Sequence, residues 1–256
     1  MSKIIQGKFK ILSNKKIGPD YFKMVIAASR IARNAQPGQF VHLRCHDSLQ
    51  PLLRRPFSFH RIKKQNFEVL YQAIGRGTKL LAKRQKGDTI DVLGPLGNGF
   101  ELAGQPILVA GGMGVAPLLA LAESFAQRKN ILVLIGAKTK KEVLCVKEFK
   151  RLGAKVGVAT DDGSRGFKGL VTDLLTKALR HKKSGAGDRI YTCGPKPMLK
   201  VVARISKQYR LLCQGSLEEK MACGVGACLG CAVQTVTGYQ KVCQDGPVFD
   251  LQDIKW

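Results

Sequence analysis

The first hundred residues alternate short apolar stretches with turn residues. Stretches rich in Val, Ile, Phe and Tyr are separated by turns such as Ile17-Gly18-Pro19-Asp20 and Lys86-Gly87-Asp88. Regular short strands of this kind are typical of an antiparallel barrel or sandwich. One helix is expected directly after Gly77. The expected strands lie near residues 3–12, 21–28, 39–45, 56–61, 67–73 and 89–93.

After the glycine-rich stretch 94–99, apolar strands alternate with helix-like stretches. Strand–helix–strand order with near-continuous apolar strands predicts a parallel sheet covered by helices on both faces. Its expected strands lie at 106–110, 131–136, 154–160 and 189–193, and its helices at 117–127, 141–151, 171–179 and 198–207. The last part of the chain is dense in cysteine and glycine and has little periodicity. We therefore expect three units, at 1–99, 100–212 and 213–256.

The cellular compartment can be predicted from the apolar stretches of the sequence, and the compartment in turn affects how the cysteines are interpreted. The N-terminus lacks the long apolar core of a signal peptide, and no run of 18 apolar residues is present. We expect a cytoplasmic protein without a membrane span. Its eight cysteines are then not expected to form a disulfide framework.

The net charge of +25, from 43 basic and 18 acidic residues, raises the question of nucleic-acid binding. The lysines, however, are spread along the chain as on a solvated surface, and no nucleic-acid motif accompanies them. We expect no nucleic-acid partner, and an acidic partner protein stays open.

Four cysteines are crowded near the C-terminus, in the pattern Cys223-x4-Cys228-x2-Cys231-x11-Cys243. Zinc ribbons use paired CxxC knuckles, whereas this is the plant-type [2Fe–2S] spacing, in which one loop supplies three of four thiolates. Interspersed glycines would let backbone N–H groups approach the sulfur atoms: Gly224, Gly226 and Gly230. A structural zinc site and four free thiols are the alternatives.

Two further motifs fall in the first unit. Arg54-Arg55-Pro56-Phe57-Ser58 lies on an expected strand, where the planar arginine fork suits a pyrophosphate. Gly75-Arg76-Gly77-Thr78 opens the expected helix, and free N–H groups at a helix N-terminus bind phosphate. The alternatives are a surface arginine beside a strand serine, and a simple helix cap formed by Thr78.

Two turns connect strands to helices in the second unit. They are Gly111-Gly112-Met113-Gly114-Val115-Ala116-Pro117 and Cys193-Gly194-Pro195-Lys196-Pro197-Met198. Dinucleotides bind at the carboxyl ends of parallel strands, so the two turns would border one crevice. The first is not the G-x-G-x-x-G fingerprint, and each alone is equally compatible with a tight turn.

Together, and in this order, these motifs resemble the ferredoxin–NADP reductase superfamily. The cysteine segment narrows the resemblance, because it continues as Val242-Cys243-x-Asp245-Gly246-Pro247-Val248-Phe249. It is similar to the family of electron-transfer subunits of dihydroorotate dehydrogenase B. The resemblance implies an N-terminal antiparallel β-barrel that binds FAD, a parallel-sheet α/β domain that binds NAD, and a C-terminal [2Fe–2S] segment.

The same resemblance implies roles for individual residues. FAD would be held by Arg55, Pro56, Phe57 and Ser58, lined by Leu70, Tyr71 and Gln72, and bound at its pyrophosphate by Gly77 and Thr78. The nicotinamide nucleotide would be bordered by Gly111, Gly112, Gly114 and Pro117, with Cys193, Gly194 and Pro195 at its contact with the flavin. Asp161-Asp162-Gly163-Ser164 would reach its adenosine half. The cluster ligands would be Cys223, Cys228, Cys231 and Cys243.

The resemblance implies an oxidoreductase subunit in pyrimidine biosynthesis. Electrons would pass from FMN in a dihydroorotate dehydrogenase catalytic subunit through the cluster and FAD to NAD, in a heterotetramer of two of each subunit. Alternatives are a related NAD(P)H–ferredoxin or sulfide dehydrogenase reductase subunit, a zinc-bearing nucleic-acid-binding module, and a thiol redox sensor. The choice of NADH over NADPH is open, because Lys138, Lys140 and Lys141 follow strand 131–136. The family prefers NAD.

Overall fold

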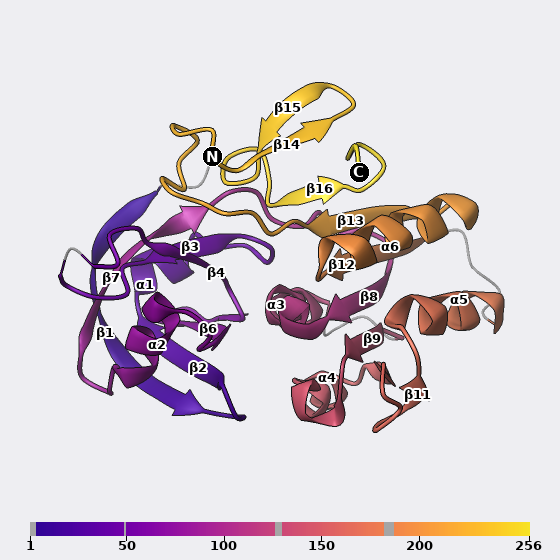
Figure 1. Cartoon of the computed structure of the whole chain (residues 1–256), viewed down its shortest axis with the longest axis horizontal. Coiled ribbons are helices and arrows are strands. Elements are labelled where there is room, and N and C mark those ends of the chain that lie inside the picture. The colour runs from indigo at the N-terminus through magenta and orange to yellow at the C-terminus, as the bar shows by residue number, and fades with distance from the viewer. Residues whose placement is uncertain (1–3, 49, 126–129, 182–186) are drawn as a thin grey trace.

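Two sheets of seven strands each form the framework of the molecule, and the C-terminal segment runs along one side of both (Figure 1). The computed structural model describes residues 4–48, 50–125, 130–181 and 187–256. The first residue of the strand expected at 3–12 and the last two residues of the helix expected at 117–127 lie outside these ranges.

The first sheet is antiparallel throughout, with strand order β4-β3-β7-β1-β2-β6-β5. It curls so that β4 and β6 approach each other, and the rings of Phe57 and Tyr71 meet edge to face at 5.7 Å. This confirms the barrel predicted from the sequence. Its strands are β1 (Ile5–Lys16), β2 (Tyr21–Ala27), β3 (Phe40–Leu43), β4 (Arg55–Ser58), β5 (Arg61–Ile62), β6 (Phe67–Gln72) and β7 (Thr89–Leu96). Two helices join them, α1 (Ser29–Ala32) and α2 (Arg76–Lys83).

Strand β6 lies between the two halves of the molecule. Alternate side chains of a strand point to opposite faces: Phe67, Val69 and Tyr71 pack in the barrel core, whereas Leu70 packs against the second domain. All but the last residue of this strand are therefore buried. The FAD-side motifs thus lie beside the nucleotide-side ones.

The second sheet has the order β11-β10-β9-β8-β12-β13-β16, parallel except for its last strand. Its strands are β8 (Gln105–Gly111), β9 (Leu132–Ala137), β10 (Lys155–Thr160), β11 (Phe167–Lys168), β12 (Asp188–Cys193), β13 (Leu212–Ser216) and β16 (Val248–Asp250). Helices α3 (Val115–Ser124) and α4 (Val146–Arg151) cover the face toward the barrel. Helices α5 (Val171–His181) and α6 (Lys196–Gln208) cover the other face. The predicted parallel α/β fold is confirmed.

The helix expected at 141–151 is shorter than predicted. A turn of 3-10 helix, η2 (Lys140–Glu142), precedes α4, and the two are separated because Cys145 adopts a left-handed backbone with φ of 62°. A second short turn, η1 (Gly112–Gly114), leads into α3. The apolar periodicity carried no sign of this break.

The C-terminal segment leaves the second sheet after β13, forms a separate hairpin, and returns as β16. The hairpin consists of β14 (Ala232–Thr235) and β15 (Gly238–Lys241). Neither β13 nor β16 was predicted as a strand of this sheet. The expected boundary at 212–213 falls at the start of β13. The bounds of all three expected units stay predictions.

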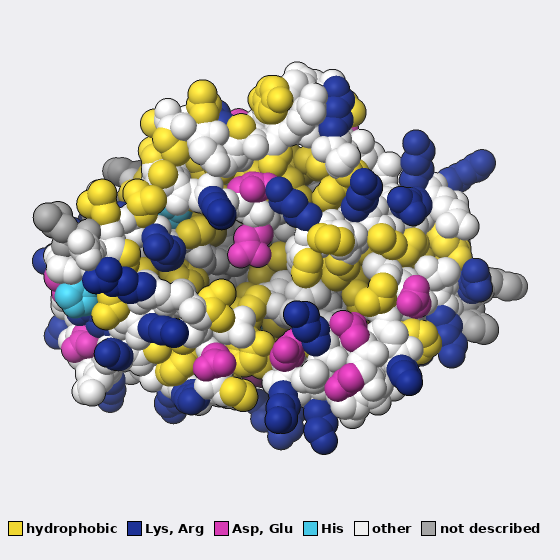
Figure 2. Space-filling view, viewed as in Figure 1, with side chains coloured by type: hydrophobic (Ala, Val, Ile, Leu, Met, Phe, Trp, Pro, Cys, Tyr) yellow, Lys and Arg dark blue, Asp and Glu magenta, His cyan; other side chains and the backbone are white. Residues whose placement is uncertain are grey.

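Figure 2 shows lysine and arginine side chains over most of the visible face, around a hollow between the two halves. In the described part of the chain, no helix has the length and apolar character needed to cross a bilayer. All eight cysteines are free thiols in the structure.

Candidate functional site

Two consecutive arginines at the barrel edge have different partners. Arg54 forms an ion pair with Asp91 of β7, with 2.7 Å between Nη2 and Oδ2, and both side chains are largely buried. Among the described residues, Arg55 donates only to the carbonyls of Leu53 and Arg54. Arg55 therefore keeps its charge available for an anion, while Arg54 holds β4 against β7.

The side chain of Arg55 lies over the start of α2. A Cβ atom added at Gly77 would be 3.6 Å from Arg55 Nε and 3.1 Å from Cys45 Sγ. Gly77 is thus enclosed between an arginine and a buried thiol, and the first amides of a helix have no partner within it. An arginine fork and a helix N-terminus meet here, which is the donor set that a phosphate requires.

Thr78 closes the first turn of α2 on itself. The N–H of Gly75 donates to Thr78 Oγ1 at 3.1 Å, and the hydroxyl donates to the Gly75 carbonyl at 3.1 Å. The N-cap of the helix is Gly75 rather than Thr78. The sequence left open that Thr78 itself caps the helix. Thr78 instead bonds to the N-cap residue Gly75, and these bonds shape the turn that would receive the phosphate.

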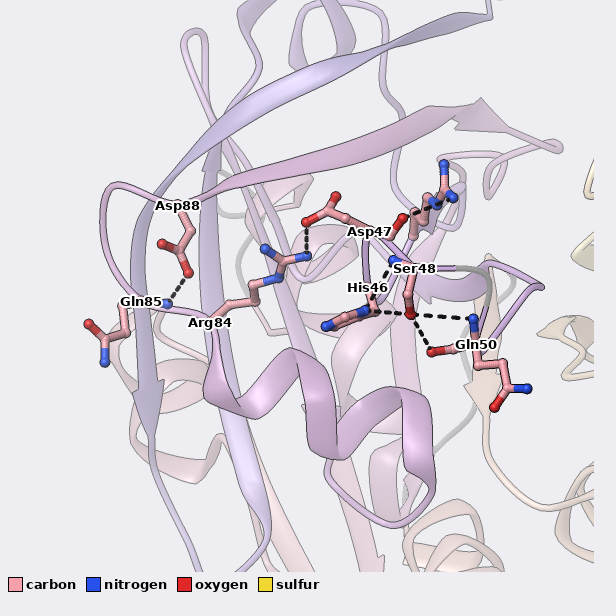
Figure 3. A network of polar contacts seen from close by, with 8 residues as sticks. His46, Asp47, Ser48, Gln50, Arg84, Gln85 and Asp88 are labelled. Carbon is pink, nitrogen blue, oxygen red and sulfur yellow. Dashed lines mark hydrogen bonds and ion pairs between the residues drawn. The ribbon is translucent and has the colours of Figure 1, made fainter.

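The other end of α2 is fixed to the barrel by side chains. Asn14 donates to the carbonyls of Leu81 and Arg84, and its own carbonyl accepts from Tyr71 Oη at 2.9 Å. Arg84 pairs with Asp47 at 2.9 Å, in the loop between β3 and β4 (Figure 3). The C-terminal end of α2 is consequently held to β1, β6 and the loop between β3 and β4.

Alternation along β4 places residues 55 and 57 on one face and residues 56 and 58 on the other. A single compact ligand would not meet both Arg55 and Ser58, whereas an elongated ligand lying along this edge strand would. All four residues of β4 are half-buried.

The three β6 residues expected to line a flavin differ in exposure. Leu70 and Tyr71 are buried, whereas Gln72 retains accessible surface. The ring of Tyr71 stacks on Phe22 at 5.6 Å, and burial raises the pKa of Tyr71 to about 12. Gln72 is the member of this set that a ligand can reach directly.

The two glycine turns of the second sheet pack directly on each other. Strands β8 and β12 are parallel neighbours, with Ala110 paired to Cys193, and the turns follow their carboxyl ends. A Cβ atom at Gly114 would collide with the Cys193 carbonyl oxygen, and one at Gly111 would lie 2.9 Å from Pro195 Cδ. Gly114 therefore lets the first turn pack directly on the backbone of the second, whereas Gly111 makes room for the side chains of Pro195 and Met198.

This packing lies where the strand order reverses, since β8 has β9 on one side and β12 on the other. Ligands of open parallel sheets bind in the crevice at such a point. Gly112 has a left-handed φ of 52° and no neighbour where its side chain would be. Pro117 is buried in α3. The accessible edge of this turn is thus bare backbone.

Cys193 is the one thiol at this crevice. Burial, reinforced by the nearby Glu218 carboxylate, raises the pKa of Cys193 to about 12. It is consequently a neutral thiol at physiological pH.

The acidic turn after β10 is preformed. Asp162 accepts from the N–H and the hydroxyl of Ser164, at 2.9 and 2.6 Å, and these hydrogen bonds lower the pKa of Asp162. Ser164 Oγ also accepts from the N–H of Lys140 at 2.7 Å. This joins the turns after β9 and β10 along one edge of the sheet.

The hairpin accounts for the long spacing between the last two cysteines. Ala232 pairs with Lys241 at the open end of the hairpin. Cys231 and Cys243 flank this end, and the Cys243 N–H donates to Cys231 Sγ at 3.4 Å. Eleven intervening residues are thus folded back so that two thiols meet.

The four thiols form two pairs. Cys223 lies within hydrogen-bond reach of Cys228, and Cys243 within reach of Cys231. Among the described residues, no three His, Cys, Asp or Glu side chains converge on a position for one metal ion. Two pairs of thiols suit two irons with two thiolates each. The cysteine segment therefore fits a [2Fe–2S] cluster.

Backbone N–H groups favour the thiolate form of Cys223, whereas burial and the neighbouring Cys231 raise the pKa of Cys243 to about 12. The N–H groups of Val225 and Gly226 donate to Cys223 and Cys243 at 3.5 and 3.2 Å. Burial opposes ionisation of Cys223, but the N–H groups directed at its sulfur outweigh it and lower the pKa to about 6. A thiolate is the form that binds metal.

Two of the three glycines expected to bring backbone to sulfur have the necessary conformation. Gly224 and Gly226 have φ of 72° and 83°. Gly230 does not have a left-handed backbone, and a Cβ there would make only an ordinary 3.6 Å contact with Cys228 Sγ.

The cysteine loop also touches the barrel, through a residue that sequence reasoning missed. A Cβ atom at Gly224 would lie 2.7 Å from the ring of His42, in the middle of β3. Burial, with Arg54 and Arg55 nearby, lowers the pKa of His42 to about 4. The available signal was a polar residue inside the apolar strand Phe40-Val41-His42-Leu43.

Comparison with known proteins gives two family matches. Residues 218–255 match the iron–sulfur cluster binding domain of dihydroorotate dehydrogenase B. Residues 108–204 match the oxidoreductase NAD-binding domain. The two matched ranges contain the paired thiols and the two packed glycine turns.

Complete chains are also similar. The electron transfer subunit of dihydroorotate dehydrogenase B (NAD(+)) from Desulforamulus reducens is 39% identical, over 100% of both chains. The solved NADH-dependent reduced ferredoxin-NADP oxidoreductase is 32% identical, with a TM-score of 0.86, over 97% of this chain and 90% of the other. A Neisseria gonorrhoeae ferredoxin NADP+ reductase shares the fold at 22% identity, with a TM-score of 0.68, over 79% and 91%.

Proposed function

Since the chain belongs to the family of electron transfer subunits of dihydroorotate dehydrogenase B, we propose that it carries electrons between a catalytic partner subunit and NAD, through a [2Fe–2S] cluster and FAD. The overall reaction is oxidation of dihydroorotate to orotate, in pyrimidine biosynthesis. The chain is an oxidoreductase subunit that depends on its partner for this reaction.

One observation carries the order of the cofactors. The cysteine loop contacts β3 through Gly224 and His42, and β3 pairs with β4, where Arg55 lies. Strand β6, which contacts β4, packs against the nucleotide domain through Leu70. The proposed FAD site therefore lies between the cysteine segment and the nucleotide crevice, which supports a path from cluster to FAD to NAD.

The proposed roles of the residues follow from their contacts. Arg55 and the first turn of α2 bind the FAD pyrophosphate, and the edge strand β4 carries Ser58 toward the flavin. The packed turns 111–117 and 193–198 orient the nicotinamide by backbone contact. Cys193 stays a neutral thiol, so it adds no charge where hydride moves. When bound, FAD exchanges two electrons with the nucleotide and single electrons with the cluster.

The finer features of the assembly are proposals carried by the family resemblance. They are FMN in the catalytic partner, a heterotetramer of two of each subunit, NAD rather than NADP, and the cytoplasm as the compartment. The hydrogen-bonded turn at Asp162 supports NAD, because an anionic carboxylate accepts from a ribose hydroxyl and repels a 2′-phosphate.

Anaerobic purification followed by counting of iron, sulfide and flavin tests the cofactor content. We expect two irons, two sulfides and one FAD per chain, with NADH-dependent reduction of artificial acceptors. A colourless protein with one zinc would overturn the proposal in favour of the zinc-bearing nucleic-acid module. Iron-free chains with reversible disulfides would favour the thiol sensor.

A second candidate is a ferredoxin-linked reductase subunit, and the 32% identical oxidoreductase structure is the observation in its favour. The two candidates differ in the electron donor. Addition of a dihydroorotate-oxidising subunit should allow dihydroorotate to reduce NAD through this chain. Transfer from reduced ferredoxin, with none from dihydroorotate, would select the second candidate.

A further inference from the structure

His42 is a buried imidazole with no polar partner in the protein. Its side chain is fully buried, and neither ring nitrogen has a hydrogen-bond partner among the described residues. Leaving a buried donor and acceptor unpaired is costly, and such groups are normally paired by protein, water or ligand. An apolar side chain of similar size would fill this position of β3 without that cost.

The ring lies against the cysteine loop. A Cβ at Gly224 would lie 2.8 Å from His42 Nδ1 and 3.1 Å from Nε2, so both nitrogens lie close to the residue after Cys223. The backbone of His42 pairs with that of Pro56 on the neighbouring strand β4, within the proposed FAD motif. Phe40, at 5.7 Å between ring centroids, packs against it.

The cysteine loop is shaped to meet this ring. Gly224 adopts φ of 72°, and any side chain there would enter the space of the imidazole. The loop backbone thereby comes against the barrel at this point. A buried N–H facing a loop of thiolates has the sulfur atoms of that loop as its natural acceptors.

We propose, on the basis of the function proposed above, that His42 donates its ring N–H to a sulfur of the iron–sulfur site and so raises the reduction potential of the cluster. Hydrogen bonds to cluster sulfur raise the potential because they stabilise the more negative reduced state. Because His42 belongs to the barrel, this hydrogen bond would couple the reduction potential of the cluster to the domain proposed to hold FAD.

The test is a redox titration of the complete, cofactor-loaded chain, with the cluster followed by electron paramagnetic resonance and the flavin by absorbance. His42→Leu removes the donor at similar volume, and His42→Gln keeps an N–H donor. In His42→Leu we expect the reduction potential of the cluster to fall by about 59 mV. The equilibrium constant for one-electron transfer between cluster and flavin then shifts about tenfold toward the reduced flavin. His42→Gln should stay near the wild-type value.

His60→Leu is the matched control. His60 is also fully buried with one ring nitrogen unpaired, but it contacts Ala116 of α3 instead of the cysteine loop. Its replacement should leave the cluster potential unchanged.

An unchanged cluster potential in His42→Leu with full iron content overturns the inference. A shift confined to the flavin overturns it too, since the ring would then serve FAD. Loss of iron in both variants would indicate a packing role instead. In each case the proposed function stands, whereas wild-type protein without iron or flavin would refute the function itself.

Discussion

At the residue scale, position 226 requires glycine for two reasons, a left-handed backbone and a lack of space for a side chain. Its φ is 83°, its N–H donates to Cys243 Sγ, and an added Cβ would collide with the Gln244 side-chain oxygen. The left-handed backbone costs about 1–2 kcal/mol for a residue with a side chain. The loop around the thiols is therefore sensitive at this position.

We expect Gly226→Ala to lose most of its cluster, because the loop must shift and withdraw the amide from the sulfur. Iron and sulfide per chain measure this. Gly230→Ala is the control, since its backbone is not left-handed and its added Cβ meets only Cys228 Sγ at 3.6 Å. Equal iron content in the two variants would contradict the prediction.

The two arginines at the barrel edge should separate binding from stability. Arg55→Gln removes a charge-assisted hydrogen bond to phosphate, worth about 1.5–3 kcal/mol, so FAD should dissociate about ten- to a hundredfold more readily. Arg54→Gln breaks the pair with Asp91 and should lower the urea midpoint instead. Equilibrium dialysis of FAD and urea titration distinguish the two. A stronger loss of FAD in Arg54→Gln would reverse the assignment.

Residue types and spacing predicted the glycines and cysteines because these sites depend on backbone conformation and thiolate number. They did not identify His42, because a polar residue inside an apolar strand does not show which distant segment it contacts. The position of Cys45 beneath Gly77 was also not predicted, because it depends on a contact between α2 and the segment after β3 that sequence spacing does not encode.

At the scale of elements, three polar contacts join the barrel to α3 and α4. Arg61 pairs with Glu123 at 2.9 Å, and Lys23 with Glu148 at 3.5 Å. Between them, the His60 ring donates to the Ala116 carbonyl at 3.1 Å. The start of α3, which follows the first glycine turn, is thus fixed against the barrel.

This contact predicts acid sensitivity. Burial lowers the pKa of His60 from 6.5 to about 4, so between these values the unfolded chain binds a proton that the folded chain refuses. Its contribution to stability is constant above pH 6.5 and is lost as the pH falls toward 4. From pH 7 to pH 5 the loss is about 2 kcal/mol.

Urea unfolding of wild-type and His60→Asn at pH 7 and pH 5 measures that loss. The variant should lose less stability than the wild type over this interval, whereas His46→Asn, in the exposed loop of Figure 3, should behave as the wild type does. Identical pH dependence in wild type and His60→Asn would refute the prediction.

Strand and helix alternation predicted most elements of the second sheet, because β8, β9, β10 and β12 are apolar runs bounded by glycine turns. The break at Cys145 was missed since its left-handed conformation arises from packing under α3 and α4. Strands β13 and β16 were missed because they are short and flank a segment dominated by cysteine and glycine.

At the scale of the whole molecule, the cysteine segment and the nucleotide half are separable. Strands β13 and β16 belong to the main sheet, whereas the four thiols all lie between them. The residues proposed for hydride transfer lie outside this stretch.

We expect Cys228→Ser to lose the cluster and electron transfer from the partner while keeping NADH-driven reduction of artificial acceptors. Hydrogen exchange should quicken between residues 219 and 245 and stay slow in β8 and β12. Loss of the NADH-driven activity together with the cluster would show that the halves are coupled.

The two strands that bound the cysteine segment are direct neighbours, with Ser216 opposite Val248. The chain therefore leaves the sheet and returns to it at almost the same place. The number of residues in the intervening loop consequently does not affect the geometry of the sheet. Such a loop can be exchanged. A tight turn in its place would yield a compact flavin reductase. A different electron carrier inserted between the same two strands would transfer electrons to another partner while both domains stay unchanged.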